Sequence, residues 1–205
     1  AVEIIDDIDT DSLCALTILH CVCNFIPNTG KISDGISLLA NLYDELDYNN
    51  LPSDRLWIDN LSILGCMTIN SFFAPNLFED RFCKMLDGYT CVGIKKESEI
   101  YNGAIQLLKD NTIDVGILVD HELLDDYVRL QINQKSSIDN LSYITVSTIG
   151  GIQHTTHNNL SELQKKCLRD IFEKYSKEEN LQNEVKRKFI DLMMHHKSIK
   201  AISKW

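Results

Sequence analysis

The stretch ILHCVCNF at residues 18–25 is followed by the turn PNTGK at residues 27–31 and by SDGISLLANLYDEL at residues 33–46. The first segment is a continuous apolar run that ends at a Pro and Gly turn, which is typical of a strand buried on both faces. The last segment repeats apolar residues with helical spacing, and Ser33 or Asp34 would cap it. These residues predict a buried strand, a turn and a helix.

The same alternation continues along the chain. Apolar segments at residues 55–59, 89–94, 113–120 and 140–151 have the length of buried strands. Helical spacing occurs at residues 75–86, 97–108, 121–131, 160–172 and 181–194. Alternating short strands and helices are typical of a parallel sheet covered on both faces. We therefore expect an α/β fold in residues 1–175, a P-loop NTPase-like, mostly parallel sheet with helices on both faces, followed by a basic C-terminal helical segment at residues 176–205.

Composition and charge exclude several classes of protein. Hydrophobic residues make up 44% of the 205 residues and charged residues 24%, so the chain is not of the disordered class. No apolar run approaches the roughly 18 residues of a spanning helix. The net charge of −10 argues against free-standing nucleic-acid binding, although residues 161–205 carry 11 Lys/Arg against 7 Asp/Glu. The seven cysteines lie mostly in apolar runs, which predicts a reducing compartment without disulfides.

A glycine and lysine between a strand and a helix raise the question of a phosphate-binding loop. In such a loop, backbone N–H groups and the helix N-terminus converge on an anion. The complete motif requires Gly at its first position and Ser or Thr directly after the Lys, whereas this chain has Phe25 and Ile32 there. Gly30 and Lys31 are retained, and Ser33 stands one residue late. An ordinary turn remains the alternative interpretation.

Five segments follow one another as RLWIDNLSILGCMTI (55–69), YTCVGI (89–94), IDVGILVDHELLDDYVRL (113–130), ITVSTIGGIQ (144–153) and SELQKKCLRDIFEKY (161–175). Their order and spacing resemble the polynucleotide 5′-hydroxyl kinase family, and within it the kinase-like subunits of the pre-mRNA 3′-end cleavage and polyadenylation factor. The resemblance implies a nuclear protein that binds ATP structurally, with Mg²⁺ as a further candidate. The residues implied for the nucleotide are Asn28, Thr29, Gly30, Lys31, Ser33 and Asp59.

The chain differs from this family at the positions that catalysis requires. Ile32 replaces the metal-ligating hydroxyl, the clasp after the third strand is replaced by residues 95–97, and the lid arginines are replaced by Lys165 and Lys166. Lysine supplies charge but not a bidentate fork. We therefore expect no catalytic residue and no kinase activity. The predicted function is a non-catalytic P-loop scaffold in a pre-mRNA 3′-end processing complex, with protein subunits as partners, only indirect or weak RNA contact and no membrane.

Two other functions remain open. One is an active RNA 5′-hydroxyl kinase that uses Lys31, Ser33 and Asp59 in a rearranged geometry. The other is an α/β protein-interaction domain without nucleotide binding, which is favoured if the turn at residues 27–33 is blocked.

Several polar clusters have ordinary explanations. The acidic N-terminal stretch is typical of a solvated segment, and His20-Cys21-x-Cys23 lacks a second pair of zinc ligands at finger-like spacing. Trp57 and Cys91 are expected in the core, and the paired histidines after residue 151 are expected in a polar loop. We assign no metal site. The acidic residues considered are Asp6, Asp7, Asp9 and Asp11, and the paired histidines are His154 and His157.

Overall fold

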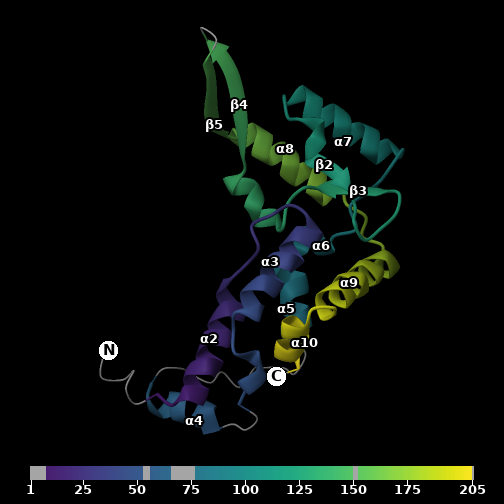
Figure 1. The fold of residues 1–205 in the computed structure, drawn as a ribbon. Coiled ribbons are helices and arrows are strands. Elements are labelled where there is room, and N and C mark those ends of the chain that lie inside the picture. Colours follow the sequence, from purple (N-terminus) through teal and green to yellow (C-terminus); the bar gives the residue numbers. More distant parts are fainter. Residues whose placement is uncertain (1–7, 53–55, 66–76, 150–151, 205) are drawn as a thin grey trace. The chain divides into compact units, whose positions relative to one another are not determined.

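The computed structural model of the chain describes residues 8–52, 56–65, 77–149 and 152–204. Among these residues the protein is mostly helical (64%), and its two small sheets are antiparallel. The chain divides into two compact units. Unit 1 comprises residues 1–27, 34–84 and 190–205, and unit 2 comprises residues 28–33 and 85–189. Figure 1 labels the helices and strands of both units.

The predicted α/β fold is wrong, because the described residues form no parallel sheet. The segment expected as the first strand lies in helix α2 (Thr10–Asn24). Its buried positions are Ser12, Ala15, Ile18 and Cys21, which recur every three residues and not every two. Asp9 caps this helix by accepting a 2.7 Å hydrogen bond from the N–H of Ser12. A continuous apolar run fits a buried helix as well as a buried strand.

Other predicted strands were also misassigned. The described part of segment 55–59 lies in α4 (Leu56–Ile63), and segment 89–94 spans the end of the short helix α6 (Asp87–Thr90) and the start of β1 (Ile94–Lys95). Segment 113–120 contains the 3₁₀ turn η2 (Val115–Ile117) and only the short strand β2 (Leu118–Asp120). The predicted helix at residues 121–131 is replaced by a turn and β3 (Tyr127–Leu130).

Five predicted helices are confirmed with small shifts of their ends. Each has apolar residues at helical spacing and a polar opposite face, which is the most reliable pattern in a sequence. They are α3 (Ile32–Asp44), α5 (Leu77–Met85), α7 (Glu99–Asp110), α8 (Glu162–Glu173) and α9 (Glu179–Met194). The remaining elements are the 3₁₀ turns η1 (Tyr48–Asn50) and η3 (Lys135–Asn140) and the helix α10 (Lys197–Ser203).

Unit 1 is built from helices. Its described core includes Ala15 of α2 packed with Trp57 and Leu61 of α4. Trp57 is 9% exposed, so its predicted place in the core is confirmed. Ser198 of α10 is buried and its hydroxyl donates to the carbonyl of Ala40 in α3 at 3.5 Å.

Unit 2 contains a three-stranded sheet in the order β1-β3-β2. In its register, Ile94 faces Val128, and Leu118 faces Leu130. Val128 and Leu130 belong to a core cluster that also includes buried residues of α7 and α8, among them Leu108 and Leu168. The hydroxyl of Tyr175 accepts a hydrogen bond from the N–H of Leu130 at 2.6 Å, so this buried backbone N–H has a partner within the core.

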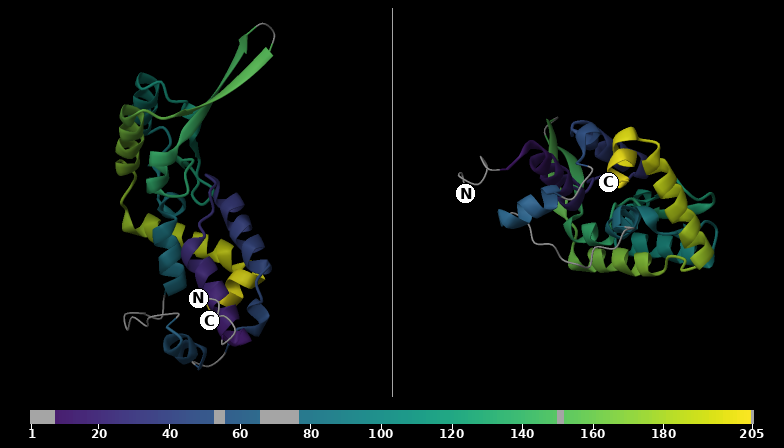
Figure 2. Two further views of the ribbon diagram at one scale, coloured as in Figure 1. Left: turned by 90° about the vertical axis from the view of Figure 1, so that its left-hand side faces the viewer. Right: turned by 90° about the horizontal axis from the view of Figure 1, so that it is seen from below.

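The second sheet of unit 2 is a β-hairpin of β4 (Ser142–Ile149) and β5 (Ile152–Asn159). The predicted strand at residues 140–151 is thus confirmed for residues 142–149, although its partner is antiparallel, and residues 150 and 151 lie outside the described residues. The register runs from Ser142 opposite Asn159 to Ile149 opposite Ile152. The hairpin extends away from the other elements of unit 2 in both Figure 1 and Figure 2. Across the described parts of the chain, no helix is both long enough and apolar enough to cross a membrane.

Candidate functional site

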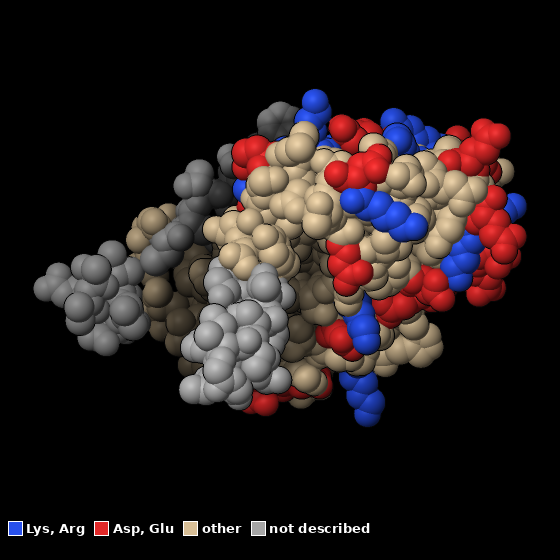
Figure 3. Space-filling model, turned by 90° about the horizontal axis from the view of Figure 1, so that it is seen from above, with Lys and Arg blue, Asp and Glu red and all other residues tan. Residues whose placement is uncertain are grey.

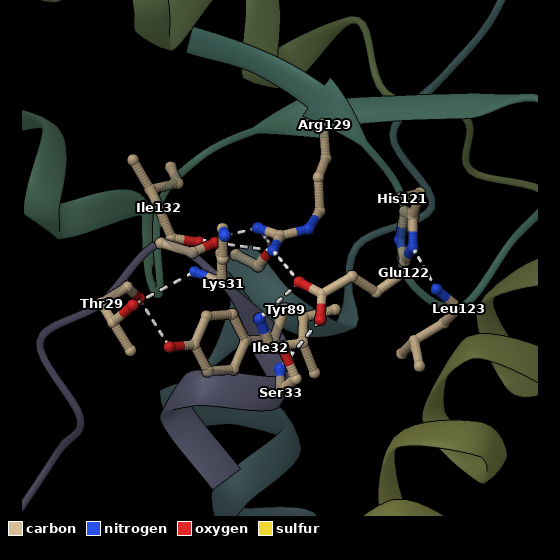
Figure 4. Close-up of polar contacts among 12 residues, drawn as sticks. Thr29, Lys31, Ile32, Ser33, Tyr89, His121, Glu122, Leu123, Arg129 and Ile132 are labelled. Carbon is tan, nitrogen blue, oxygen red and sulfur yellow. Dashed lines mark hydrogen bonds and ion pairs between the residues drawn. The ribbon is translucent and has the colours of Figure 1, made fainter. Parts of the chain in front are cut away.

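Residues 28–33 of the predicted phosphate loop lie in unit 2, directly before and within the first turn of α3. Two buried side chains of this unit hold its backbone, as Figure 4 shows. Tyr89 donates its hydroxyl to the carbonyl oxygen of Thr29 at 2.6 Å, and Arg129 donates from Nη2 to the carbonyl oxygen of Gly30 at 2.7 Å. The loop carbonyls are therefore held by protein donors.

Glu122 occupies the N-terminus of α3. Its two carboxylate oxygens accept the N–H groups of Ile32 and Ser33 at 2.7 and 2.9 Å. Burial by itself would raise the pKa of Glu122, but these N–H groups and the guanidinium of Arg129 outweigh it, so the pKa lies below its usual value. The helix start thus binds an anion, and that anion is a carboxylate of the same chain.

Arg129 is the largest fully buried side chain of the described residues. Besides Gly30, it donates from Nη1 to the carbonyl oxygens of Gly88, Leu130 and Ile132 at 3.1 to 3.3 Å. Its Nη2 lies 3.5 Å from a carboxylate oxygen of Glu122, and its guanidinium carbon lies 5.6 Å from the centre of a buried tyrosine ring. The guanidinium therefore neutralises Glu122 and satisfies several carbonyl groups at once.

Gly30 is required here for close packing. A Cβ atom at this position would lie 2.3 Å from the carbonyl oxygen of Gln131, which no real Cβ contact tolerates. The glycine that suggested an approach of phosphate to the backbone instead permits an approach of the β3 segment.

The structure brings together only part of the predicted nucleotide site. Asn28, Thr29, Gly30, Lys31 and Ser33 lie on one segment of unit 2, where the side chain of Lys31 is exposed. Asp59 lies exposed in α4, a helix of unit 1. A phosphate that used the helix start would have to displace the carboxylate already bound there.

Sequence reasoning missed Glu122 and Arg129. Both lie in HELLDDYVRL, which was predicted as a helix, and nothing in their spacing points to residues 28–33. The neighbouring His121 is buried between the carbonyl oxygen of Cys91, 2.8 Å from Nε2, and the N–H of Leu123, which donates to Nδ1 at 3.0 Å. Burial, with a contribution from Arg129, lowers the pKa of His121 to about 4.

A second feature of unit 2 is a cleft at the foot of the hairpin, with a volume of about 400 Å³. Four of its lining residues are apolar, namely Ile113, Ile117, Leu141 and Leu160. The other five have polar side chains, namely Thr112, Asp114, Ser142, Tyr143 and Gln164.

The other candidates from the sequence do not form sites among the described residues. His20, Cys21 and Cys23 share one helix, and no group of three potential metal ligands occurs in the part of the chain that the structure describes. Asp9 serves as a helix cap, whereas Asp6 and Asp7 lie outside the described residues.

Cys91, which was expected in the core, is partly buried against the core cluster of unit 2, and its thiol is held in the neutral form. Burial raises the pKa of its thiol to about 12, which is the opposite of the shift that activates a cysteine. The histidines His154 and His157 lie on β5 and not in a loop, and Gly150 and Gly151 lie outside the described residues.

Comparison with known proteins adds no relative: no protein-family model, no curated protein and no solved structure matches this chain. The resemblance to the polynucleotide kinase family therefore rests on the five quoted segments. Its expected parallel strands are not found among the described residues, so the fold gives that resemblance no support.

Proposed function

We propose that the protein is a non-enzymatic interaction module that binds a partner protein by strand addition to the β4–β5 hairpin and needs no nucleotide. The observation that carries this proposal is the hairpin itself, two strands of eight residues that pair with each other and with no third strand among the described residues. A two-stranded ribbon has two free edges, and each offers unpaired backbone groups.

The register identifies which backbone groups face outward. The N–H of Leu160 donates to the carbonyl oxygen of Leu141 at 3.3 Å, directly below the ladder. Bonded and non-bonded pairs alternate in an antiparallel ribbon, so the pairs that follow from Ser142 opposite Asn159 in steps of two are non-bonded. Their N–H and C=O groups point to the free edges, at residues 142, 144, 146 and 148 of β4 and at residues 153, 155, 157 and 159 of β5.

The sequence of the hairpin does not protect these edges. Natural edge strands are commonly blocked by Lys, by other charges or by Pro. Residues 141–160 contain no Asp, Glu, Lys, Arg or Pro, although 24% of the whole chain is charged. An uncharged ribbon of roughly 26 Å, at about 3.3 Å per residue, favours pairing with an extended segment of another protein.

Charge favours a protein partner over nucleic acid. Unit 2 contains 14 Lys/Arg and 16 Asp/Glu, and Figure 3 shows residues of both signs next to one another on the charged part of the face that it draws. Phosphate binding needs a concentrated basic surface. The closure of the helix start by Glu122 supports the part of the proposal that excludes nucleotide.

Two measurements test this function. Thermal unfolding with and without millimolar ATP and Mg²⁺ is expected to give the same midpoint, because a ligand of the native state raises it; an upward shift would contradict the nucleotide-free function. Display selection with a library of random 12-residue peptides on the purified full chain is expected to enrich binders. Their binding should be lost when Val146→Pro and Thr155→Pro are combined, because each removes one outward N–H and spares the ladder.

The combined proline variant must keep the far-ultraviolet circular dichroism and the unfolding midpoint of the unmodified protein. If it does so and still binds the selected peptides, strand addition is wrong. The assignment to a pre-mRNA 3′-end processing complex in the nucleus stays a prediction, and copurification of cleavage and polyadenylation subunits from the native cell would support it.

A further inference from the structure

We infer that the free edge of β4 and the cleft at its foot form one binding site, which takes an extended peptide segment of a partner protein with an apolar anchor residue. This inference rests on the proposed strand addition and specifies its edge, its pocket and the chemistry of the peptide.

The cleft adjoins β4 more closely than β5. Ser142 and Tyr143, the first two residues of β4, line it together with Leu141, which directly precedes the strand. From the β5 side only Leu160 lines it, one residue beyond the end of that strand. A peptide strand paired with the edge of β4 would therefore pass over the cleft where it reaches Ser142, whose N–H and C=O are the lowest outward-facing pair.

The wall of the cleft suits an apolar side chain. The four apolar lining residues are only partly buried: one side of each faces the cleft, and the other side packs against the core cluster of unit 2. They are Ile113, Ile117, Leu141 and Leu160. Their positions are fixed by that packing, so the pocket exists before a ligand binds. Asp114 carries the one formal charge among the lining residues, and its carboxylate already accepts the N–H of Gly116 at 3.0 Å.

Size and exposure indicate a large anchor. A volume of about 400 Å³ exceeds what one methyl or isopropyl group would fill, so leucine, phenylalanine or tryptophan is expected. Tyr143 lines the cleft and is 47% exposed, which leaves an aromatic surface available to the anchor. The recognition then combines backbone pairing along β4 with one side-chain pocket, as in other cases of strand addition.

A second copy of the chain is the less suitable occupant. Each copy carries a net charge of −10, and like charge opposes association of two copies. A short extended segment of another protein brings the required backbone edge and anchor without this repulsion.

The matched positions across the hairpin supply the test. Val146 and Thr155 are register partners with outward N–H groups, one on each edge, and Ser142 and Asn159 are register partners of which only Ser142 lines the cleft. Binding of a selected fluorescent peptide is measured by anisotropy. Val146→Pro and Ser142→Trp are each expected to weaken binding at least tenfold, whereas Thr155→Pro and Asn159→Trp leave it within twofold.

The anchor is tested on the peptide side. Replacing the large apolar residue of the peptide by alanine should also weaken binding at least tenfold, and binding of the alanine peptide should no longer depend on Ser142→Trp.

Loss of binding with Thr155→Pro alone assigns the β5 edge and overturns the inference while strand addition stands. Equal binding by Ser142→Trp and Asn159→Trp overturns the pocket. A dimer in analytical ultracentrifugation that Val146→Pro abolishes makes a second copy the occupant and also overturns it, whereas a library that enriches nothing refutes the proposed function itself.

Discussion

The substitution Glu122→Gln tests whether an internal carboxylate closes the start of α3. The replacement keeps the size of the side chain and one carbonyl oxygen, but it removes the charge and puts an NH₂ group where the second oxygen accepts an N–H. One of the two N–H groups, of Ile32 at 2.7 Å or of Ser33 at 2.9 Å, then faces a donor.

The expected loss of unfolding free energy is about 2–3 kcal/mol. A hydrogen bond to a charged group contributes about 1.5–3 kcal/mol, and a charge at a helix N-terminus adds about 0.3–1 kcal/mol. Breaking a fully buried ion pair costs about 3–5 kcal/mol. The lower value is expected here because the Glu122 side chain is 31% exposed and Arg129 keeps its four carbonyl acceptors.

Urea unfolding measures the global effect, and amide hydrogen exchange at Ile32 and Ser33 measures the local one. Asp125→Asn is the matched control, since it removes one negative charge from an exposed residue of the same segment and should change stability by less than about 0.5 kcal/mol. Equal stability of the two variants, with unchanged protection of both amides, would refute the closed helix start.

The pH dependence has a definite sign. The folded-state pKa of Glu122 lies below its usual value, so its contribution is complete above the unfolded pKa of about 4.3 and is lost as the pH falls through the folded value. The difference between the unmodified protein and Glu122→Gln should therefore be constant from pH 7 to about 5 and shrink below about pH 4.3.

Three further predictions concern the same unit. His121 has a folded pKa of about 4, below its unfolded value, so the native state loses stability as the pH falls below about 6.5, and His121→Asn should flatten this part of a stability profile measured by urea unfolding. Gly30→Ala should cost at least about 2 kcal/mol by thermal unfolding, because its Cβ would overlap a carbonyl oxygen, whereas Gly103→Ala in open space on α7 should stabilise by about 1 kcal/mol. Tyr175→Phe leaves the N–H of Leu130 without its acceptor and should lower the free energy of unfolding in urea by about 1–3 kcal/mol. An increase in stability would instead indicate that the hydroxyl is buried without a useful hydrogen bond.

The sequence predicted the amphipathic helices but not the sheet. In α7 and α8, Ser98 and Ser161 stand at the N-caps and apolar residues repeat at helical spacing, so local signals agree with the fold. In α2 the local sequence pattern does not identify the helix, because the apolar periodicity is weak and the buried side is set by packing against Trp57 and Leu61. Tertiary packing decided between two structures that the local pattern allowed.

The candidate site was predictable only in its location. Gly30 and Lys31 drew attention to the start of α3, and a helix does begin at Ile32. The groups that define the chemistry there, Glu122 and Arg129, lie about 90 residues away in the sequence, and no motif spacing links them to this loop. An isolated sequence cannot show such long-range partners.

The uncharged segments of this chain show why composition alone does not separate core from interface. Residues 12–30 and residues 141–160 both lack Asp, Glu, Lys and Arg. The first segment includes most of α2, where Ala15 and Ile18 are almost completely buried. The second forms a ribbon with two free edges, and Tyr143 at its foot is 47% exposed. Burial within unit 1 therefore accounts for the apolar residues Ala15 and Ile18, although Leu13 of the same helix is 50% exposed. In the hairpin, the absence of charge is explained if the β4 edge is covered by a partner when the protein functions.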